Sequence, residues 1–264
     1  MALPIRDDHT PKQVPWLTLA LLAINVIVFL FIQPSGFQVG AVDSLQSEQW
    51  RIVESDEFSY RWGAVACEVT TGELVITEPD DCKGEVSEYL PAQKSIGLSL
   101  LTCMFVHGSI LHLAGNMLFL WVFGKNVEWR IGRANFLGLY LIGGILATLG
   151  FVASNPTAAV PLVGASGAIA VAMGAYLVLF PRGRVLTVIA TAAFQVVYVP
   201  AAVVLALFFV TQFFTADDNV AWEAHAAGMA AGVVGALVLS RVPAIRRRAA
   251  EDARDADVRV GQEF

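Results

Sequence analysis

Five polar side chains stand inside long apolar runs of this sequence, where a strongly polar group is costly. They are His107, His112, Asn116, Ser166 and His225. A charged side chain at membrane depth costs about 2.5–3.5 kcal/mol on insertion scales, so polar residues there need a reason. Serine, histidine and asparagine are also residue types of nucleophilic catalysis, in which a base activates a hydroxyl and donors hold the oxyanion. These side chains are therefore the candidates for chemistry.

The spacing of His112 and Asn116 places both on one face of a helix, because they are four residues apart. His107 is five residues before His112 and is rotated away from it. The sequence has neither the His-Glu-x-x-His motif of a zinc site nor the Gly-x-Gly-Asp motif of an aspartyl intramembrane protease. Taken alone, the pair also fits an interhelical hydrogen bond that holds a bundle together. We expect no metal and no cofactor.

Ser166 stands in the segment Gly164-Ala165-Ser166-Gly167, which follows Pro161 and opens an apolar helix. The unpaired backbone N–H groups and the positive dipole end of a helix N-terminus suit a developing oxyanion. The segment differs from the Gly-x-Ser-x-Gly turn of soluble hydrolases, because the glycine follows the serine directly. By itself the segment favours close helix packing over catalysis, because small residues are common wherever membrane helices pack closely.

His225 is the only histidine in an apolar run outside the segment 100–123, and Gly228 and Gly232 follow it. Two small residues four apart let helix backbones approach closely. If the helices that carry Ser166 and His225 pack in this way, the serine hydroxyl comes within hydrogen-bond reach of the imidazole. That arrangement is what a histidine needs to activate a serine nucleophile.

Three motifs, in this order along the chain, resemble those of the rhomboid intramembrane serine proteases. They are His107-Gly-Ser-Ile-Leu-His112-Leu-Ala-Gly-Asn116, Gly164-Ala-Ser166-Gly167 and Ala224-His225-x-x-Gly228-x-x-x-Gly232. The resemblance covers about Leu100 to Ser240, with a compatible first helix. It implies a six-helix rhomboid fold and hydrolysis of peptide bonds within the membrane.

The resemblance also implies a role for each motif residue. Ser166 would be the nucleophile and His225 the general base of a dyad. His112, Asn116 and the backbone N–H of Ser166 would form the oxyanion hole. The supporting residues would be His107, Gly164, Gly167 and Gly228. Glu128 and Arg130, in a segment that resembles the cytoplasmic turn after the family's second helix, would be structural.

Three positions depart from the family pattern. Ala170 stands one turn after the serine, where the family often has an aromatic residue under the histidine. Gln93-Lys94 occupies the region where a Trp-Arg pair is usual. Glu223 is an added carboxylate, but a residue two positions before His225 points away from it on a helix, which favours a dyad over a triad.

The composition indicates a polytopic membrane protein. Of the 264 residues, 56% are hydrophobic and 15% are charged, whereas soluble domains average about 45–50% and about 25%. These values exclude a nucleic-acid binder with a basic face, a disordered chain and a small disulfide scaffold. Six apolar runs are candidates for membrane helices. They are Trp16–Gln33, Leu100–Phe123, Phe136–Ala153, Ala165–Phe180, Val185–Thr215 and Val220–Ser240. The sequence thus predicts an all-α six-helix bundle.

The charge distribution predicts the orientation of the chain. With both termini in the cytoplasm, 13 of the 17 Lys and Arg residues lie on the inner side. The expected parts are an N-terminal tail (1–15), a transmembrane domain (16–240) and a charged, solvated tail (241–264). We interpret the first run as a retained helix rather than a secretory signal, because no Ala-x-Ala cleavage site follows it. A prokaryotic plasma membrane fits this pattern.

The expected outer loop, residues 34–99, holds 12 acidic residues and two of the three cysteines. Alternating residues on both sides of Thr71-Gly72 suggest a small hairpin. Cys67 and Cys82 flank it and would form a disulfide on the oxidising side of a membrane, the alternative being two free thiols.

The expected function is cleavage of a membrane-spanning helix that enters laterally and is cut near its outer end. The expected partners are such substrates and the lipid bilayer, with no nucleic acid, and the sequence does not indicate an oligomeric state. A non-catalytic adaptor of the same family would lack the serine or the histidine, and this chain has both. A transporter would need an acidic residue at the midplane or matched broken helices.

Overall fold

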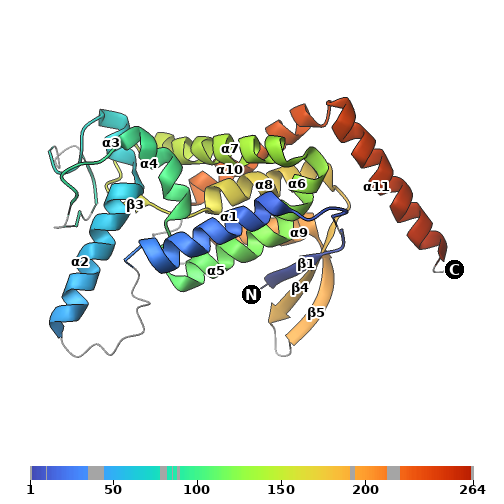
Figure 1. Cartoon of the computed structure of the whole chain (residues 1–264), viewed down its shortest axis with the longest axis horizontal. Coiled ribbons are helices and arrows are strands. Elements are labelled where there is room, and N and C mark those ends of the chain that lie inside the picture. Colours follow the sequence, from blue (N-terminus) through green and yellow to red (C-terminus); the bar gives the residue numbers. More distant parts are fainter. Residues whose placement is uncertain are drawn as a thin grey trace.

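The computed structural model describes residues 2–9, 11–34, 45–77, 82–84, 86–87, 90–190, 194–212 and 221–262 (Figure 1). The helices are α1 (Trp16–Ile27), η1 (Val28–Ile32), α2 (Leu45–Trp62), α3 (Ala66–Thr71), α4 (Ile96–Thr102), η3 (Cys103–Phe105), α5 (Ile110–Phe119), η4 (Leu120–Gly124), α6 (Lys125–Ile131), α7 (Arg133–Ser154), α8 (Ser166–Leu179), α9 (Ala201–Gln212), α10 (Trp222–Leu239) and α11 (Pro243–Gln262). The strands are β1 (Ala2–Asp7), β2 (Ala64–Val65), β3 (Pro161–Leu162), β4 (Arg184–Ala190) and β5 (Phe194–Pro200).

The prediction of a mainly helical membrane protein is confirmed. Within the described residues, three helical stretches are long and apolar enough to cross a membrane, and four apolar helices are shorter. The long ones are Ile110–Ile131, Arg133–Ser154 and Trp222–Leu239; the shorter ones are Trp16–Ile32, Ile96–Phe105, Ser166–Leu179 and Ala201–Gln212. The number of spanning helices stays a prediction. In Figure 1, α1, α5, α7 and α8 run alongside one another, with α2 and α3 at one end and α11 at the other.

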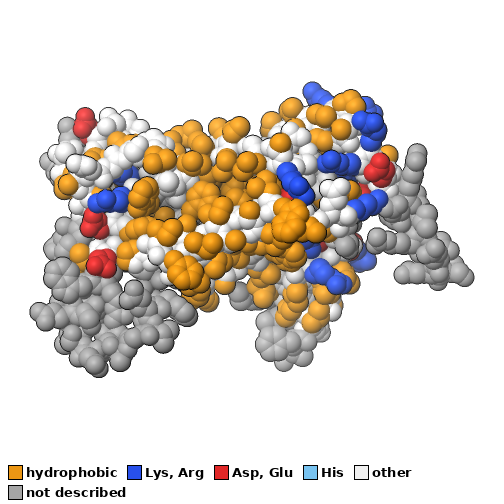
Figure 2. All heavy atoms as spheres, in the orientation of Figure 1, with side chains coloured by type: hydrophobic (Ala, Val, Ile, Leu, Met, Phe, Trp, Pro, Cys, Tyr) orange, Lys and Arg blue, Asp and Glu red, His pale blue; other side chains and the backbone are white. Residues whose placement is uncertain are grey.

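The charged side chains gather at the two ends of this bundle. Most of the Lys and Arg visible in Figure 2 lie at the end that carries α6 and α11, and a band of hydrophobic side chains separates them from the end that carries α2 and α3. This separation is the pattern expected of a protein that spans a bilayer.

The predicted helix Leu100–Phe123 is wrong as one continuous element, because the chain leaves the helix at Val106 and re-enters it at Ile110. Ser109 causes the restart: its Oγ accepts a hydrogen bond from the backbone N–H of His112 at 3.1 Å, which is the usual action of a serine N-cap. The apolar composition continues across the break, so hydropathy alone did not show it. His107 therefore lies in a loop rather than on a helix.

The predicted helix Val185–Thr215 is also wrong over its first half. Strands β4 and β5 lie there instead and pair antiparallel, with Arg184 opposite Pro200 and Ala190 opposite Phe194. The segment is rich in valine, isoleucine and threonine, which favour strands. Strand β1 pairs antiparallel with β4, giving the order β1-β4-β5, so the chain is not all-α and part of its N-terminal segment belongs to a sheet. The last residues of the predicted run lie outside the described residues.

The outer segment contains a short helix where the hairpin was predicted. α3 ends at Thr71, and the next residue, Gly72, has a φ of +81°, the left-handed conformation that commonly closes a helix. Cys67 and Cys82 form a disulfide in the structure. The buried Lys94 Nζ lies 2.5 Å from Glu68 Oε2, and burial lowers the pKa of this amino group. Strands β2 and β3 pair, which connects this outer layer to the segment that leads into α8.

Helix α6 joins several elements at the opposite end of the bundle. Glu128 accepts hydrogen bonds from the backbone N–H groups of Leu17 and Thr18 and from the Thr18 hydroxyl, and thereby caps α1. Arg130 pairs with Asp252 of α11 at 2.8 Å and donates to the Leu179 carbonyl at the end of α8. The C-terminal tail, predicted as solvated, is therefore helical and attached to α6.

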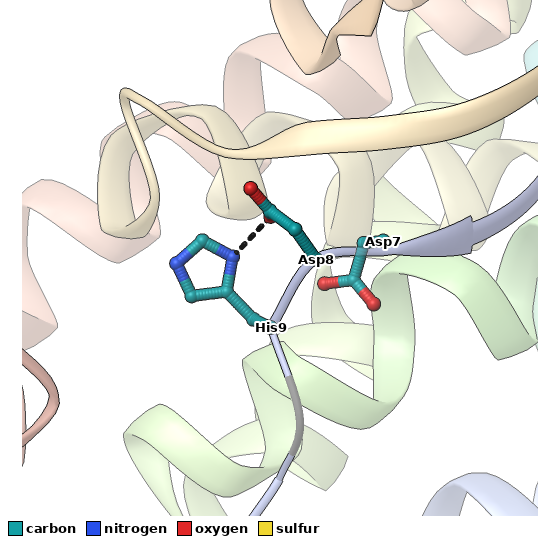
Figure 3. Close-up of side chains that lie close together, drawn as sticks. All are labelled: Asp7, Asp8 and His9. Carbon is teal, nitrogen blue, oxygen red and sulfur yellow. Dashed lines mark ion pairs between the residues drawn. The ribbon is translucent and has the colours of Figure 1, made fainter. Parts of the chain in front are cut away.

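Asp7, at the end of β1, is buried in the same region. Lys125 Nζ lies 3.0 Å from its Oδ1, and its Oδ2 accepts hydrogen bonds from Asn126 and from the Tyr176 hydroxyl. Asp8 and His9 follow and pair with each other at 2.8 Å (Figure 3). The three side chains are spaced as metal ligands could be, but both oxygens of Asp7 are engaged by the protein. These contacts hold the end of β1 against α6 and α8.

Replacing Glu128 by alanine should destabilise the protein. The change leaves buried donors at the start of α1 without an acceptor, which costs about 1–3 kcal/mol. Arg133→Ala is the matched control, because its half-exposed guanidinium lies 3.7 Å from the same carboxylate and such pairs contribute about 0–1 kcal/mol. Thermal unfolding in detergent micelles measures both. Equal midpoints for Glu128→Ala and the wild type would contradict the capping role.

Candidate active site

A cavity of about 1120 Å³ lies among α5, α8, α9, α10 and the segment 158–163. Ser166, His225, His112 and Asn116 all line it. These residues come from three helices that are far apart in the sequence, and the fold brings them to one space. The predicted catalytic and oxyanion residues therefore share a cavity large enough for a peptide segment.

Ser166 is the first residue of α8, so the backbone N–H groups around it lie at a helix N-terminus. Gly164, two residues earlier, has a φ of +125°, a backbone conformation that residues with a side chain rarely adopt. A Cβ atom at Gly164 would lie 2.7 Å from His112 Cε1 and 2.8 Å from His112 Nε2. The glycine therefore lets the segment before the serine run directly against the imidazole.

Glycines set the distance between α8 and α10, the helices of Ser166 and His225. A Cβ atom at Gly228 would overlap the Gly167 carbonyl oxygen, and one at Gly232 would overlap that of Val171. From the other side, a Cβ atom at Gly174 would overlap the Met229 carbonyl oxygen. The two backbones thus touch, as the spacing of small residues predicts.

His225 is oriented by α9 rather than by the serine. Its Nδ1 lies 2.6 Å from Gln212 Oε1, and its ring centroid is 5.7 Å from that of Phe208. Within the described part of the chain, no hydrogen bond joins Ser166 to His225, although both line the cavity. Such bonds are often long in ligand-free sites and tighten when substrate binds. In this orientation Nε2 is the ring nitrogen of His225 that does not face Gln212.

Asn116 presents an unused hydrogen-bond donor at this site. Its Nδ2 is buried and finds no acceptor within the described residues. A buried amide without a partner is costly, so an orphaned donor of this kind needs an explanation. His112 lies one turn earlier on the same face and also lines the cavity. An oxyanion in the cavity would supply the missing acceptor.

His107 does not line the cavity but lies behind His112. Their ring centroids are 5.2 Å apart, and His107 is fully buried. Gln33 holds its backbone from the end of the first helix: His107 N–H donates to Gln33 Oε1 at 3.1 Å, and Gln33 Nε2 donates to the His107 carbonyl at 2.6 Å. The loop between η3 and α5, whose Gly108 and Ser109 line the cavity, is thereby held in place.

The family of this chain follows from comparison with known proteins. The model of the Rhomboid domain matches residues 96–242. The chain belongs to the rhomboid family. The matched segment contains all five polar residues with which the sequence analysis begins.

Three curated relatives illustrate the similarity. Presenilin-associated rhomboid-like protein A, mitochondrial, of Danio rerio is 34% identical over 36% of this chain and 25% of its own length. Rhomboid protein 1, mitochondrial, of Saccharomyces cerevisiae is 34% identical over 40% and 32%, respectively. Rhomboid protease GluP of Bacillus subtilis is 42% identical over 30% and 15%. The chain thus matches at most a third of each of these relatives.

The structure shows the surroundings of two positions, Ala170 and Glu223, at which this rhomboid-family protein departs from the usual pattern. Ala170 provides no ring beneath His225, and Phe208 of α9 contacts the imidazole instead. Glu223 lines the cavity and accepts a hydrogen bond from Asn155 at 3.2 Å, so it does not hold the histidine. Sequence reasoning missed Phe208 and Gln212. A glutamine near the end of an apolar run was the only available signal.

Adding a methyl group at Gly232 should separate α8 from α10. Gly232→Ala should cost about 1–3 kcal/mol, because overpacking forces backbone shifts, and should lower activity with it. Gly138→Ala in α7 is the control, since no atom lies within 4 Å of its added Cβ and alanine favours the helix by about 0.5–1 kcal/mol. Thermal unfolding in micelles distinguishes them. A Gly232→Ala protein as stable as Gly138→Ala would refute the close contact.

Proposed function

We propose that this protein is an intramembrane serine endopeptidase that cleaves transmembrane or juxtamembrane segments by a Ser166–His225 dyad. The observation that carries the proposal is the shared cavity, in which a serine at a helix N-terminus, a histidine and an orphaned amide donor meet. The rhomboid family includes intramembrane serine proteases, and a Bacillus subtilis relative is named a protease.

The chemistry follows from these groups. His225 accepts the Ser166 hydroxyl proton as the serine oxygen attacks the substrate carbonyl carbon. The carbonyl oxygen becomes an oxyanion, which the Ser166 backbone N–H, the Asn116 amide and His112 stabilise. Collapse of this intermediate expels the amine, which takes the proton from His225 and leaves an acyl-enzyme. A water molecule, deprotonated by His225, then hydrolyses the ester and restores the serine.

The proposed substrate is a membrane helix cut near its outer end. The cavity is lined by Ser166 at the start of α8 and by Pro161 and Leu162 of β3, which lie on the outer side in the proposed orientation with both termini in the cytoplasm. A peptide bond inside a helix is shielded by its own hydrogen bonds, so segments with glycine or proline should be preferred. The named relatives are mitochondrial and bacterial, and the charge pattern favours a prokaryotic plasma membrane.

A reporter protein with one transmembrane helix tests the proposal. We expect the purified wild type in liposomes to cleave it, and Ser166→Ala and His225→Ala to leave it intact. Cleavage that survives Ser166→Ala, with contaminating proteases excluded by mass spectrometry, would overturn the assigned nucleophile. A helix-binding adaptor without protease activity would bind such reporters and cleave none of them.

Asn116→Ala should reduce kcat by about 10²–10³, because it removes one oxyanion donor. KM should change little, since the donor acts mainly in the transition state. Ile110→Ala at the exposed start of α5 is the control and should retain full kcat. Steady-state cleavage of a fluorogenic transmembrane peptide measures both parameters. An unchanged kcat in Asn116→Ala would remove this residue from the oxyanion hole.

A further inference from the structure

The side-chain amide of Gln212, the last residue of α9, is hydrogen-bonded through both its oxygen and its nitrogen. Its Oε1 lies 2.6 Å from His225 Nδ1, and its Nε2 donates to the Phe208 carbonyl at 3.2 Å. The carbonyl of Phe208 is an acceptor only, so the nitrogen of the amide must face it. The oxygen of the amide then faces the imidazole.

This direction of the amide determines the protonation of His225. An amide oxygen accepts hydrogen bonds and cannot donate them, so the Nδ1 atom opposite it must carry the proton. In the neutral imidazole the other nitrogen, Nε2, then has the free lone pair. That lone pair is the one that can accept a proton from a serine.

We propose that Gln212 is a positioning residue for catalysis that holds His225 in its Nδ1–H form with Nε2 as the base. This inference rests on the proposed protease function. Gln212 acts as the carboxylate does in a Ser-His-Asp triad, by setting tautomer and ring orientation, but with a neutral acceptor. Phe208 restricts the ring from the same helix. The carboxylate that lines the cavity, Glu223, bonds Asn155 and is not in a position to take this role.

Two substitutions of Gln212 separate positioning from packing. Gln212→Leu keeps the approximate size and removes the acceptor, and should lower kcat about tenfold to a hundredfold with KM nearly unchanged. Gln212→Glu restores an acceptor at the same reach and should recover most of the lost kcat. Thr211→Val is the control, because its hydroxyl also donates to the Phe208 carbonyl but does not face the cavity. It should have the wild-type kcat.

A spectroscopic measurement tests the tautomer itself and needs no turnover. ¹⁵N NMR of histidine-labelled protein in micelles should show His225 as the Nδ1–H form in the wild type and in Gln212→Glu. The same form should be depleted in Gln212→Leu, and His225→Ala identifies the signal. If Gln212→Leu does not fold, Gln212→Met provides the same test with a flexible side chain.

The outcomes distinguish this inference from the proposed function. A wild-type kcat for a folded Gln212→Leu protein, or an unchanged Nδ1–H signal in it, would overturn the positioning role while leaving the protease intact. A wild type that cleaves no reporter would refute the protease function, whereas the NMR signal would still decide what Gln212 does to His225.

Discussion

The site depends on the contact between the backbones of α8 and α10. Three glycines remove the side chains that would keep these helices apart, and carbonyl oxygens occupy the space where Cβ atoms would be. Because the contact is made by main chain, the positions of Ser166 and His225 relative to each other depend on helix geometry rather than on flexible side chains.

Polar side chains then fix the ends of the elements around the pair. Glu128 caps α1, Arg130 joins the end of α8 to α11, and Gln33 holds the loop that carries His107. Each of these groups satisfies backbone atoms that a helix end or loop leaves without partners. Because these side chains are buried in the protein, losing one of them would leave backbone atoms without partners at a cost of about 1–3 kcal/mol.

Much of this arrangement could be predicted from the sequence. Apolar runs located α1, α7, α8 and α10 to within a few residues, and the spacing of Gly228 and Gly232 predicted the close helix contact. Hydropathy failed to predict the type of element in two apolar runs, because an apolar segment has the same hydropathy whether it is a strand, a helix or a broken helix. It did not distinguish the β4–β5 hairpin from a helix, and it did not reveal the Ser109 cap that divides the second run.

The contacts of single polar residues were the least predictable part of the site. Gln212 precedes His225 by 13 residues and lies on another helix, so only the packed structure brings the two together. The same holds for Gln33 and His107, which are 74 residues apart. Long-range pairing of this kind depends on how helices are placed, and neither hydropathy nor the motifs contain that information.

His225 and the side chains that contact its ring lie on different helices, α10 and α9, and this affects the order in which substrate entry and cleavage would occur. The base is carried by one helix, but the groups that orient it, Gln212 and Phe208, belong to another that borders the same cavity. A displacement of α9 away from α10 would withdraw these groups from the imidazole. If the protein has the proposed protease function, a substrate that entered by displacing α9 would be cleaved only after α9 had returned to the imidazole.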